Sequence, residues 1–253
     1  MAESIGPDLG GQTVLVTGGA SGLGNAISGL LAGCGARILI GDINADAAEA
    51  AAADLPGDGH IAQALDVRDE ASCAAAVGRA VADLGRLDIL VNSAGIFRVA
   101  PAVEMAIEDF EQSLAINVTG SFLMARHAAK AMIDVGYGRV INMASVSSTV
   151  VNHEYAAYST SKAAVAQLTR ILALEWAKTG ITVNAIGPAV IPTPMSNAPL
   201  ADDGYRAGAL SKIPMGRFGA PEDLFGVIRM LSAPGSDFVT GQVFYVDGGR
   251  TLL

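Results

Sequence analysis

The sequence predicts an α/β fold: a single doubly wound domain, residues 1–253, in which helices cover both faces of a seven-stranded parallel sheet. Short β-branched runs alternate with longer Ala- and Leu-rich stretches along the whole chain. Such alternation is typical of βαβ units, whose helical crossovers keep the strands parallel. The strand candidates are continuously apolar, as expected when both faces of a sheet are buried. No repeat or linker interrupts the pattern, and 253 residues suit one α/β domain.

Seven apolar segments are the predicted strands. In chain order they are TVLVT (13–17), RILIG (37–41), IAQAL (61–65), LDILV (87–91), RVINM (139–143), TVNAI (182–186) and QVFYV (242–246). The Ala- and Leu-rich stretches between them predict helices at 22–34, 46–54, 69–84, 107–133, 155–178 and 221–231. Residues 189–220 show neither pattern and contain several prolines, so we expect an irregular lid segment over the substrate rather than a domain boundary.

Charge and hydropathy argue against nucleic acid and membranes as partners. Lys and Arg number 16 against 25 Asp and Glu, a formal net charge of −9, and an acidic surface repels phosphate backbones. Aromatic residues make up 5%, which leaves few platforms for base stacking. No run approaches the ~20 apolar residues that cross a bilayer, and the N-terminus holds no apolar block, so we expect neither a membrane span nor a signal peptide.

The cysteines and histidines predict a cytoplasmic protein without a metal site. Cys34 and Cys73 lie in Ala-rich helical patterns and lack metal-ligand spacing, so both are expected to be reduced core thiols. The three histidines are dispersed along the sequence and form no cluster with Cys or carboxylate residues.

A glycine-rich turn, TGGASGLG at 17–24, follows the first predicted strand and opens the first helix. Gly18 can adopt positive φ in a tight turn, Gly22 lets the backbone approach a pyrophosphate, and Gly24 has no Cβ to hold helix and strand apart. The helix N-terminus then offers free N–H groups to an anion. An ordinary turn is the alternative for this motif alone, but in this fold it favours a Rossmann-type dinucleotide site.

Asp42 favours NAD as the cofactor. It ends the second strand about 20 residues after the glycines, where a carboxylate accepts hydrogen bonds from the ribose hydroxyls and repels the 2′-phosphate of NADP. No Arg lies in residues 41–53 to receive that phosphate. The alternative role of Asp42 is a helix N-cap, which Asn44 or Asp46 could equally supply.

Two further groups fall at the same edge of the predicted sheet. Asp66 and Val67 follow the third strand, and the NSAG motif at 92–95 follows the fourth. Each can contact the adenine or ribose of a dinucleotide. Taken singly, the turn-forming chemistry of Asx and Gly residues explains either equally well.

Ser145, Tyr158 and Lys162 are the candidate chemical groups. Ser145 follows the fifth strand, and Tyr158 and Lys162, four residues apart, project from one face of a helix. A free phenol titrates near ~10, and a nearby ammonium together with a positive nicotinamide is expected to lower this pKa. Reaching neutrality requires about 4 kcal/mol, much of which one ammonium in a partly dry cleft can supply.

Several other residues compete for these roles. A Tyr and Lys four residues apart usually decorate a helix surface, and Tyr155 is a second tyrosine without a lysine at that spacing. Ser147 and Ser148 are alternative hydrogen-bonding groups for the substrate. His127 lies among Ala and Met in a predicted helix and is expected to be structural. His153 precedes the tyrosine helix and either lines the substrate pocket or lies outside it.

Together these residues resemble the short-chain dehydrogenase/reductase family over essentially the whole chain, and the resemblance extends to its NAD-preferring polyol and sugar dehydrogenases. The motifs that carry it are TGGASGLG at 17–24, Asp42, Asp66 with Val67, NSAG at 92–95, Asn117, Ser145, Tyr158-xxx-Lys162 and the stretch 184–195. Each motif alone is weak, but this order and spacing are specific.

The resemblance implies a role for each residue. Tyr158 would be the general acid/base, Ser145 would hold the substrate oxygen, and Lys162 would bind the nicotinamide ribose and lower the pKa of the tyrosine. Asn117, otherwise an ordinary polar residue within a helix, would position a water that relays protons. The implied cofactor-binding set is Gly18, Ser21, Gly22, Leu23, Gly24, Asp42, Asp66, Val67, Asn92, Ala94, Gly95, Tyr158, Lys162, Pro188, Ile191 and Thr193.

Two positions depart from the family pattern. Ala189 stands where the family usually has Gly after Pro188, which restricts the backbone and bears on how the lid closes. Ser93 replaces the second Asn of the usual Asn-Asn-Ala-Gly motif. Neither change removes a catalytic group. Family members are commonly homotetramers, and the apolar C-terminus at 251–253 suits burial by a partner subunit.

The expected function is NAD-dependent interconversion of a secondary alcohol and a ketone, with a polyol, sugar or sugar acid as the small-molecule substrate. A 3-oxoacyl thioester reductase and a small hydroxyketone or hydroxy acid dehydrogenase are alternatives, although the former more often uses NADPH, against which Asp42 argues. A non-catalytic NAD-binding sensor is an alternative of another class. The Ser145–Tyr158–Lys162 set argues against it, because binding alone requires no phenolate.

Overall fold

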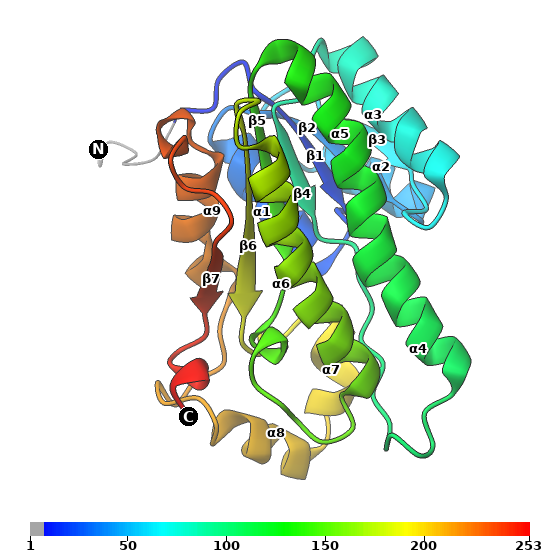
Figure 1. The fold of residues 1–253 in the computed structure, drawn as a ribbon, viewed down its shortest axis with the longest axis vertical. Helices are drawn as coiled ribbons and strands as arrows, with labels where there is room; N and C mark the ends of the chain where they lie inside the picture. The colour runs from blue at the N-terminus through cyan, green and yellow to red at the C-terminus, as the bar shows by residue number, and fades with distance from the viewer. Residues whose placement is uncertain (1–7) are drawn as a thin grey trace.

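The computed structural model describes residues 8–253 and confirms the doubly wound α/β fold (Figure 1). Its seven-stranded sheet has the order β3-β2-β1-β4-β5-β6-β7, and every neighbouring pair is parallel. The strands are β1 (Thr13–Thr17), β2 (Arg37–Asp42), β3 (Ile61–Ala64), β4 (Ile89–Asn92), β5 (Gly138–Met143), β6 (Ile181–Pro188) and β7 (Val243–Val246). The strand order reverses between β1 and β4, which is where such sheets open a ligand crevice.

Helices cover both faces of the sheet. One core contains side chains of α1 (Gly22–Gly33), α2 (Ala45–Ala53) and α9 (Phe225–Ser232). The opposite core contains those of α3 (Glu70–Leu84), α5 (Ser121–Val135) and α6 (Ala156–Trp176), and Figure 1 shows α5 and α6 in front of the strands. Side chains of β1 alternate between the two cores, Val14 and Val16 entering the first and Leu15 the second. This double burial is the physical reason for the continuously apolar strands.

The helical stretches expected at 107–133 are α4 (Ile107–Leu114), the π-helical segment η1 (Ala115–Gly120) and α5. One predicted segment needs correction. Residues 189–220 are not irregular throughout, because they contain α7 (Pro194–Leu200) and α8 (Asp203–Leu210). Pro194 is compatible with α7 because it occupies the first turn, where its missing N–H has no helical partner. Four short 3₁₀ segments complete the chain: η2 (Val146–Ser148), η3 (Pro221–Leu224), η4 (Pro234–Ser236) and η5 (Arg250–Leu252).

The cysteines are free thiols. Cys73 is buried and Cys34 partly buried. Burial raises the pKa of the Cys73 thiol to about 11, which keeps it unreactive.

Within residues 8–253 none of the helices has the length and hydrophobicity needed to cross a membrane. No group of three or more His, Cys, Asp or Glu side chains in this part of the chain is arranged to hold a metal ion. The predicted absence of a signal peptide rests on residues 1–10, of which 1–7 lie outside the described residues.

A buried chain of amides and hydroxyls ties β4, β5 and α6 together. Asn92 Nδ2 donates to Asn142 Oδ1 at 2.9 Å, and Asn142 Nδ2 donates to Thr169 Oγ1 at 2.9 Å. Thr169 Oγ1 donates in turn to the carbonyl of Val165. None of the three polar side chains is more than 3% exposed, so water cannot replace a lost partner. Asn92 therefore belongs to the framework of the sheet.

Replacing Asn142 by Ala should lower the free energy of unfolding by about 2–3 kcal/mol, because it removes a partner from two buried groups and opens a small cavity. Urea unfolding followed by circular dichroism measures the change. Gln167→Ala, at an exposed position of α6, is the control and should change stability by no more than about 0.5 kcal/mol. Equal effects of the two substitutions would contradict a structural role for this network.

Candidate active site

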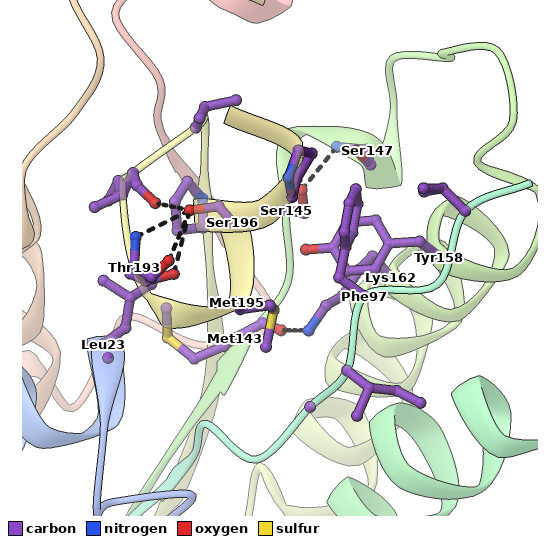
Figure 2. A pocket seen from close by; sticks show the side chains of 18 of the residues that line it. Leu23, Phe97, Met143, Ser145, Ser147, Tyr158, Lys162, Thr193, Met195 and Ser196 are labelled. Atoms are coloured by element: carbon purple, nitrogen blue, oxygen red, sulfur yellow. Dashed lines mark hydrogen bonds between the residues drawn. The ribbon is translucent and has the colours of Figure 1, made fainter. Parts of the chain in front are cut away.

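A cleft of about 1020 Å³ lies along the edge of the sheet where the strands end. The turn after β1, the carboxyl ends of β2 to β6 and the helices α7 and α8 line it. Doubly wound sheets bind their ligands at this position. Figure 2 shows Ser145, Tyr158 and Lys162 on one side of the cleft and Thr193 and Ser196 opposite them.

The glycine-rich turn forms one end of the cleft and has the shape of a dinucleotide cradle. Gly18 has φ +63°, and a Cβ there would lie 2.8 Å from the Cα of Ala94. A Cβ on Gly24 would lie 2.2 Å from the Gly18 carbonyl oxygen, so only glycine permits this approach of helix to strand. Ser21 is the N-cap of α1 but makes no side-chain capping bond, and Gly22 and Leu23 line the cleft. The first N–H groups of α1 are thus available to a phosphate group.

Asp42 lies at the end of β2 with its carboxylate at the cleft. Its Oδ2 accepts from Ala20 N–H at 3.2 Å and its Oδ1 from Asn44 N–H at 3.1 Å. Asn44, not Asp42, caps α2, since its side chain accepts from Ala47 N–H at 3.1 Å. The capping explanation of Asp42 is therefore wrong, and its carboxylate links the glycine-rich turn to the end of β2.

Asp66 and Val67 also line the cleft. The Arg68 guanidinium beside Asp66 lowers the pKa of its carboxyl, mainly through a side-chain hydrogen bond. The two side chains form an ion pair of 2.6 Å. Sequence reasoning did not identify Arg68, which lies just past the predicted pair.

The NSAG motif divides between the cleft and the core. Ala94 and Gly95 line the cleft together with Ser93. The side chain of Asn92 does not reach it, because it is occupied by Asn142 and by the carbonyl of Ser121 at 3.2 Å. The prediction that Asn92 contacts the cofactor therefore lacks side-chain support.

The chemical end of the cleft brings Ser145, Tyr158 and Lys162 together (Figure 2). Ser145 lies directly beyond β5, and its Oγ accepts from Ser147 N–H at 3.1 Å. Tyr158 lies on α6, and its ring meets Phe97 edge-on with 4.8 Å between centroids. Lys162 is buried one turn later; its Nζ donates to the Met143 carbonyl at 2.7 Å and lies 5.8 Å from the centroid of the Tyr158 ring.

Burial shifts the pKa values of both Tyr158 and Lys162 in the cofactor-free protein. Burial raises the pKa of Tyr158 above its ordinary value, and only hydrogen bonding to Ser145 opposes this rise. Burial also lowers the pKa of Lys162 to about 8. The prediction that Lys162, together with a bound positive nicotinamide, lowers the pKa of Tyr158 stays a prediction; without a cofactor, desolvation dominates and the ammonium donates to the Met143 carbonyl.

Asn117 lies in the π-helical segment η1, behind the wall of the cleft. Its Oδ1 accepts from Ile96 N–H at 2.8 Å, and its Nδ2 donates to Ile96 O at 3.1 Å and to Ser161 Oγ at 2.9 Å. A Cβ on Gly95 would lie 3.1 Å from Asn117 Oδ1 and 3.7 Å from Lys162 Nζ, so this glycine brings the amide close to the lysine. The Asn117 side chain itself is 1% exposed and does not line the cleft.

The segment 189–220 lines the cleft beyond the end of β6. Ala189, Ile191 and Thr193 are among its lining residues, next to Pro188 at the end of β6. A Cβ on Gly22 would be 3.7 Å from Thr193 Cβ, so this segment reaches the glycine-rich turn.

The residues that compete for the catalytic and substrate-binding roles divide into those that line the cleft and those that do not. Tyr155, Ser147 and His153 line the cleft. Ser148 does not, and its hydroxyl hydrogen-bonds Tyr245 at 2.9 Å. His127 lies on α5, away from the cleft, with its Nε2 3.5 Å from Glu70.

Sequence reasoning did not single out several other polar residues of the cleft, among them Asn152, Lys212 and Arg250. Arg250 carried a usable signal, because it follows the last strand on the edge where ligands bind. Asn152 and Lys212 come from a loop and a turn whose packing no periodic pattern predicts.

Lys162 should make the stability of the cofactor-free protein rise with pH. Between its folded pKa of about 8 and its unfolded value of 10.5, the unfolded chain holds the proton and the folded protein does not, so stability increases through this window. From pH 7.5 to 9.5 the gain attributable to Lys162 should be about 2 kcal/mol. Urea unfolding of the wild type and Lys162→Met at both values measures it as the difference between the two proteins. A constant difference would contradict the lowered pKa.

Known proteins match this sequence and fold over almost the whole chain. A family profile described as enoyl-(acyl carrier protein) reductase matches residues 18–251. D-threitol dehydrogenase of Mycolicibacterium smegmatis is 43% identical, with 96% of this chain and 94% of that protein covered. The crystal structure of a gluconate 5-dehydrogenase from Burkholderia cenocepacia in complex with NADP and tartrate is 34% identical over 97% of both chains, with a TM-score of 0.93. That of the 3-ketoacyl-(acyl-carrier-protein) reductase from Brucella melitensis complexed with NADH is 33% identical over 96% of this chain and 99% of that chain, with a TM-score of 0.89.

These similarities extend from the glycine-rich turn to the last strand, so they include both ends of the cleft. They agree with the order of motifs in the sequence and with the strand order of the sheet. The chain belongs to the short-chain dehydrogenase/reductase family of nicotinamide-dependent oxidoreductases that act on CH–OH groups.

Proposed function

We propose that this protein is an NAD(H)-dependent dehydrogenase that interconverts a secondary alcohol and a ketone in a polyol, sugar or sugar acid. The observation that carries the proposal is that Ser145, Tyr158 and Lys162 lie in the same cleft as the glycine-rich turn. The relatives support the substrate class, since one is a threitol dehydrogenase and another a gluconate 5-dehydrogenase.

The cleft fits a nicotinamide dinucleotide, which would supply hydride transfer when bound. The turn at 18–24 and the N-terminus of α1 would hold its pyrophosphate, because glycine leaves room for close approach and the helix end presents N–H groups. Val67 and Gly95 would contact the adenosine half of the dinucleotide, and Ile191 and Thr193 would cover the nicotinamide.

Tyr158 would remove the hydroxyl proton of the substrate during oxidation and return it during reduction. Ser145 would donate a hydrogen bond to the same substrate oxygen, and its hydrogen bonding to Tyr158 favours the phenolate. Lys162 would bind the nicotinamide ribose, and Asn117 would hold Ile96 and Ser161 in place beside the proton path. General acid–base catalysis of this kind contributes roughly 10²–10⁴ in rate.

We infer a lid function for 189–220 from its contacts. The Tyr205 hydroxyl of α8 hydrogen-bonds the Tyr155 hydroxyl at the start of α6, at 2.5 Å. The Tyr155 ring in turn packs edge-on against Phe97 and Tyr158. Closure of the lid is therefore connected to the wall that positions the catalytic tyrosine.

Exposed apolar side chains support association of the chain with further copies, and the homotetramer is the assembly expected from the family resemblance. Ile107 of α4, Phe122 and Ile133 of α5, and the C-terminal Leu252 and Leu253 are all accessible in the single chain. Contact between subunits through these elements would bury them and stabilise the assembly by the hydrophobic effect.

Tyr158→Phe should reduce kcat by at least about 10³-fold, because the phenylalanine has no proton to exchange. NADH production from a panel of polyols and sugar acids measures turnover, and NADH fluorescence measures cofactor binding, which should persist. Tyr155→Phe is the matched control and should retain activity within about tenfold. If the Tyr158 variant keeps most of its activity, Tyr158 is not the general base.

Asp42 should make the wild type prefer NAD⁺ over NADP⁺ in kcat/KM, because its carboxylate repels a 2′-phosphate. Asp42→Ala should lower kcat/KM for NAD⁺ by about tenfold and narrow or reverse the preference, as expected for one lost charged hydrogen bond. Asp46→Ala, exposed in the first turn of α2, is the control and should change neither. A wild-type preference for NADP⁺ would overturn the assignment of NAD.

A further inference from the structure

The outer part of the cleft adjoins a smaller hollow that is positively charged. Its volume is about 460 Å³, and its lining residues are Val151, Asn152, His153, Lys212 and Arg250. All of these except Val151 also line the main cleft, so the two spaces share a wall. This hollow lies at the substrate side, since none of its residues belongs to the glycine-rich turn or to the ends of β2 and β3.

In this hollow, the side chains of Lys212 and Arg250 donate to the same neutral acceptor, the amide oxygen of Asn152. Lys212 Nζ donates to Asn152 Oδ1 at 3.2 Å, and Arg250 Nη2 donates to the same oxygen at 3.4 Å. The three residues come from the loop after η2, the turn after α8 and the C-terminal segment after β7. The fold thus gathers two positive charges from distant parts of the sequence around one amide.

In the described part of the chain, no carboxylate lies within ion-pair distance of Lys212 or Arg250. Asp202, an acidic residue of the cleft, uses its carboxylate to cap α8 through Tyr205 N–H at 2.7 Å. Asp247, close to Arg250 in sequence, accepts from Gly249 N–H and from Thr251.

This arrangement of two neighbouring cations favours the binding of an anion. Two like charges held on one amide repel each other, and a chain with a formal net charge of −9 offers many carboxylates that could have paired with them. A bound carboxylate would accept from the ammonium and the guanidinium at once, and the fork of Arg matches its two oxygens.

We propose that the substrate is a sugar acid whose carboxylate is bound by Lys212 and Arg250, at the end remote from the carbinol group whose hydroxyl proton Tyr158 removes. Asn152 is a positioning residue that holds the two cations side by side. The proposal rests on the dehydrogenase function above and selects, within that substrate class, the acids over the neutral polyols.

Matched acids and alditols test the proposal. D-gluconate and D-sorbitol differ only at C1, which is a carboxylate in one and a hydroxymethyl group in the other, and four- and five-carbon pairs extend the panel. Turnover with NAD⁺ and thermal shifts of the NADH-loaded protein give two independent measurements. We expect kcat/KM at least tenfold higher for the acid of the best pair, and a larger thermal shift with acids than with alditols.

Substitutions at the two cations assign the effect to this site. Lys212→Gln and Arg250→Gln should each lower kcat/KM for the acid by about 10- to 100-fold, the range for a hydrogen bond to a charged group. The kcat/KM for the alditol should stay within threefold of the wild-type value. Arg250→Lys should restore part of the loss. Arg206→Gln is the control: this cation of α8 lies over Phe218 and does not line the cleft, so it should change neither value.

The outcomes separate the two proposals. Turnover of alditols as good as that of acids, or equal losses on both substrates in the variants, overturns the carboxylate site and leaves the dehydrogenase function intact. Selective turnover of phosphorylated alditols also overturns it, because the anion is then a phosphate. If no compound is oxidised, the dehydrogenase function is wrong, and the thermal shifts still test the carboxylate site. That site is overturned if acids cause no thermal shift. It is also overturned if Lys212→Gln and Arg250→Gln leave the acid-dependent shift unchanged.

Discussion

The parallel direction of all seven strands is the constraint on which the cleft depends. Because every strand ends at the same edge, the turn after β1, Asp42 at the end of β2 and Ser145 after β5 open on one space, although more than 100 residues separate the first from the last. Gly24 makes the arrangement possible at one end, since any side chain there would collide with the Gly18 carbonyl. The buried amides of Asn92 and Asn142 fix β4 against β5 beneath the cleft.

Burial sets the chemistry at the other end. It disfavours both the phenolate of Tyr158 and the ammonium of Lys162. The charged forms depend on specific partners: the Ser145 hydroxyl for the phenolate and the Met143 carbonyl for the ammonium. A desolvated pair of this kind responds strongly to any charge that enters the cleft, because the local dielectric constant is low.

Charge is distributed unevenly over the cleft, and the distribution fits a division of tasks. Asp42 and Asp66 lie at the dinucleotide end, where the Asp66 charge is balanced by Arg68. Lys212 and Arg250 lie at the substrate end with Asn152 between them. A protein with a formal net charge of −9 thus carries two positive side chains in this hollow, and complementary charge of this kind gives specificity as well as attraction for an anionic group.

The sequence by itself determined the doubly wound fold and the seven strands to within one or two residues at each end. It also pointed to Asp42, Ser145, Tyr158 and Lys162 as residues of the cleft. The alternation of strands and helices, the hydropathy of the strands and the spacing of the motifs are local properties of the chain. Only the tertiary structure showed that Asn92 and Asn117 are held behind the cleft wall, that 189–220 is partly helical, and that Lys162 faces the Met143 carbonyl. It also brought Asn152, Lys212 and Arg250 together. These features depend on burial and on contacts between distant segments, and neither leaves a periodic signal in the sequence.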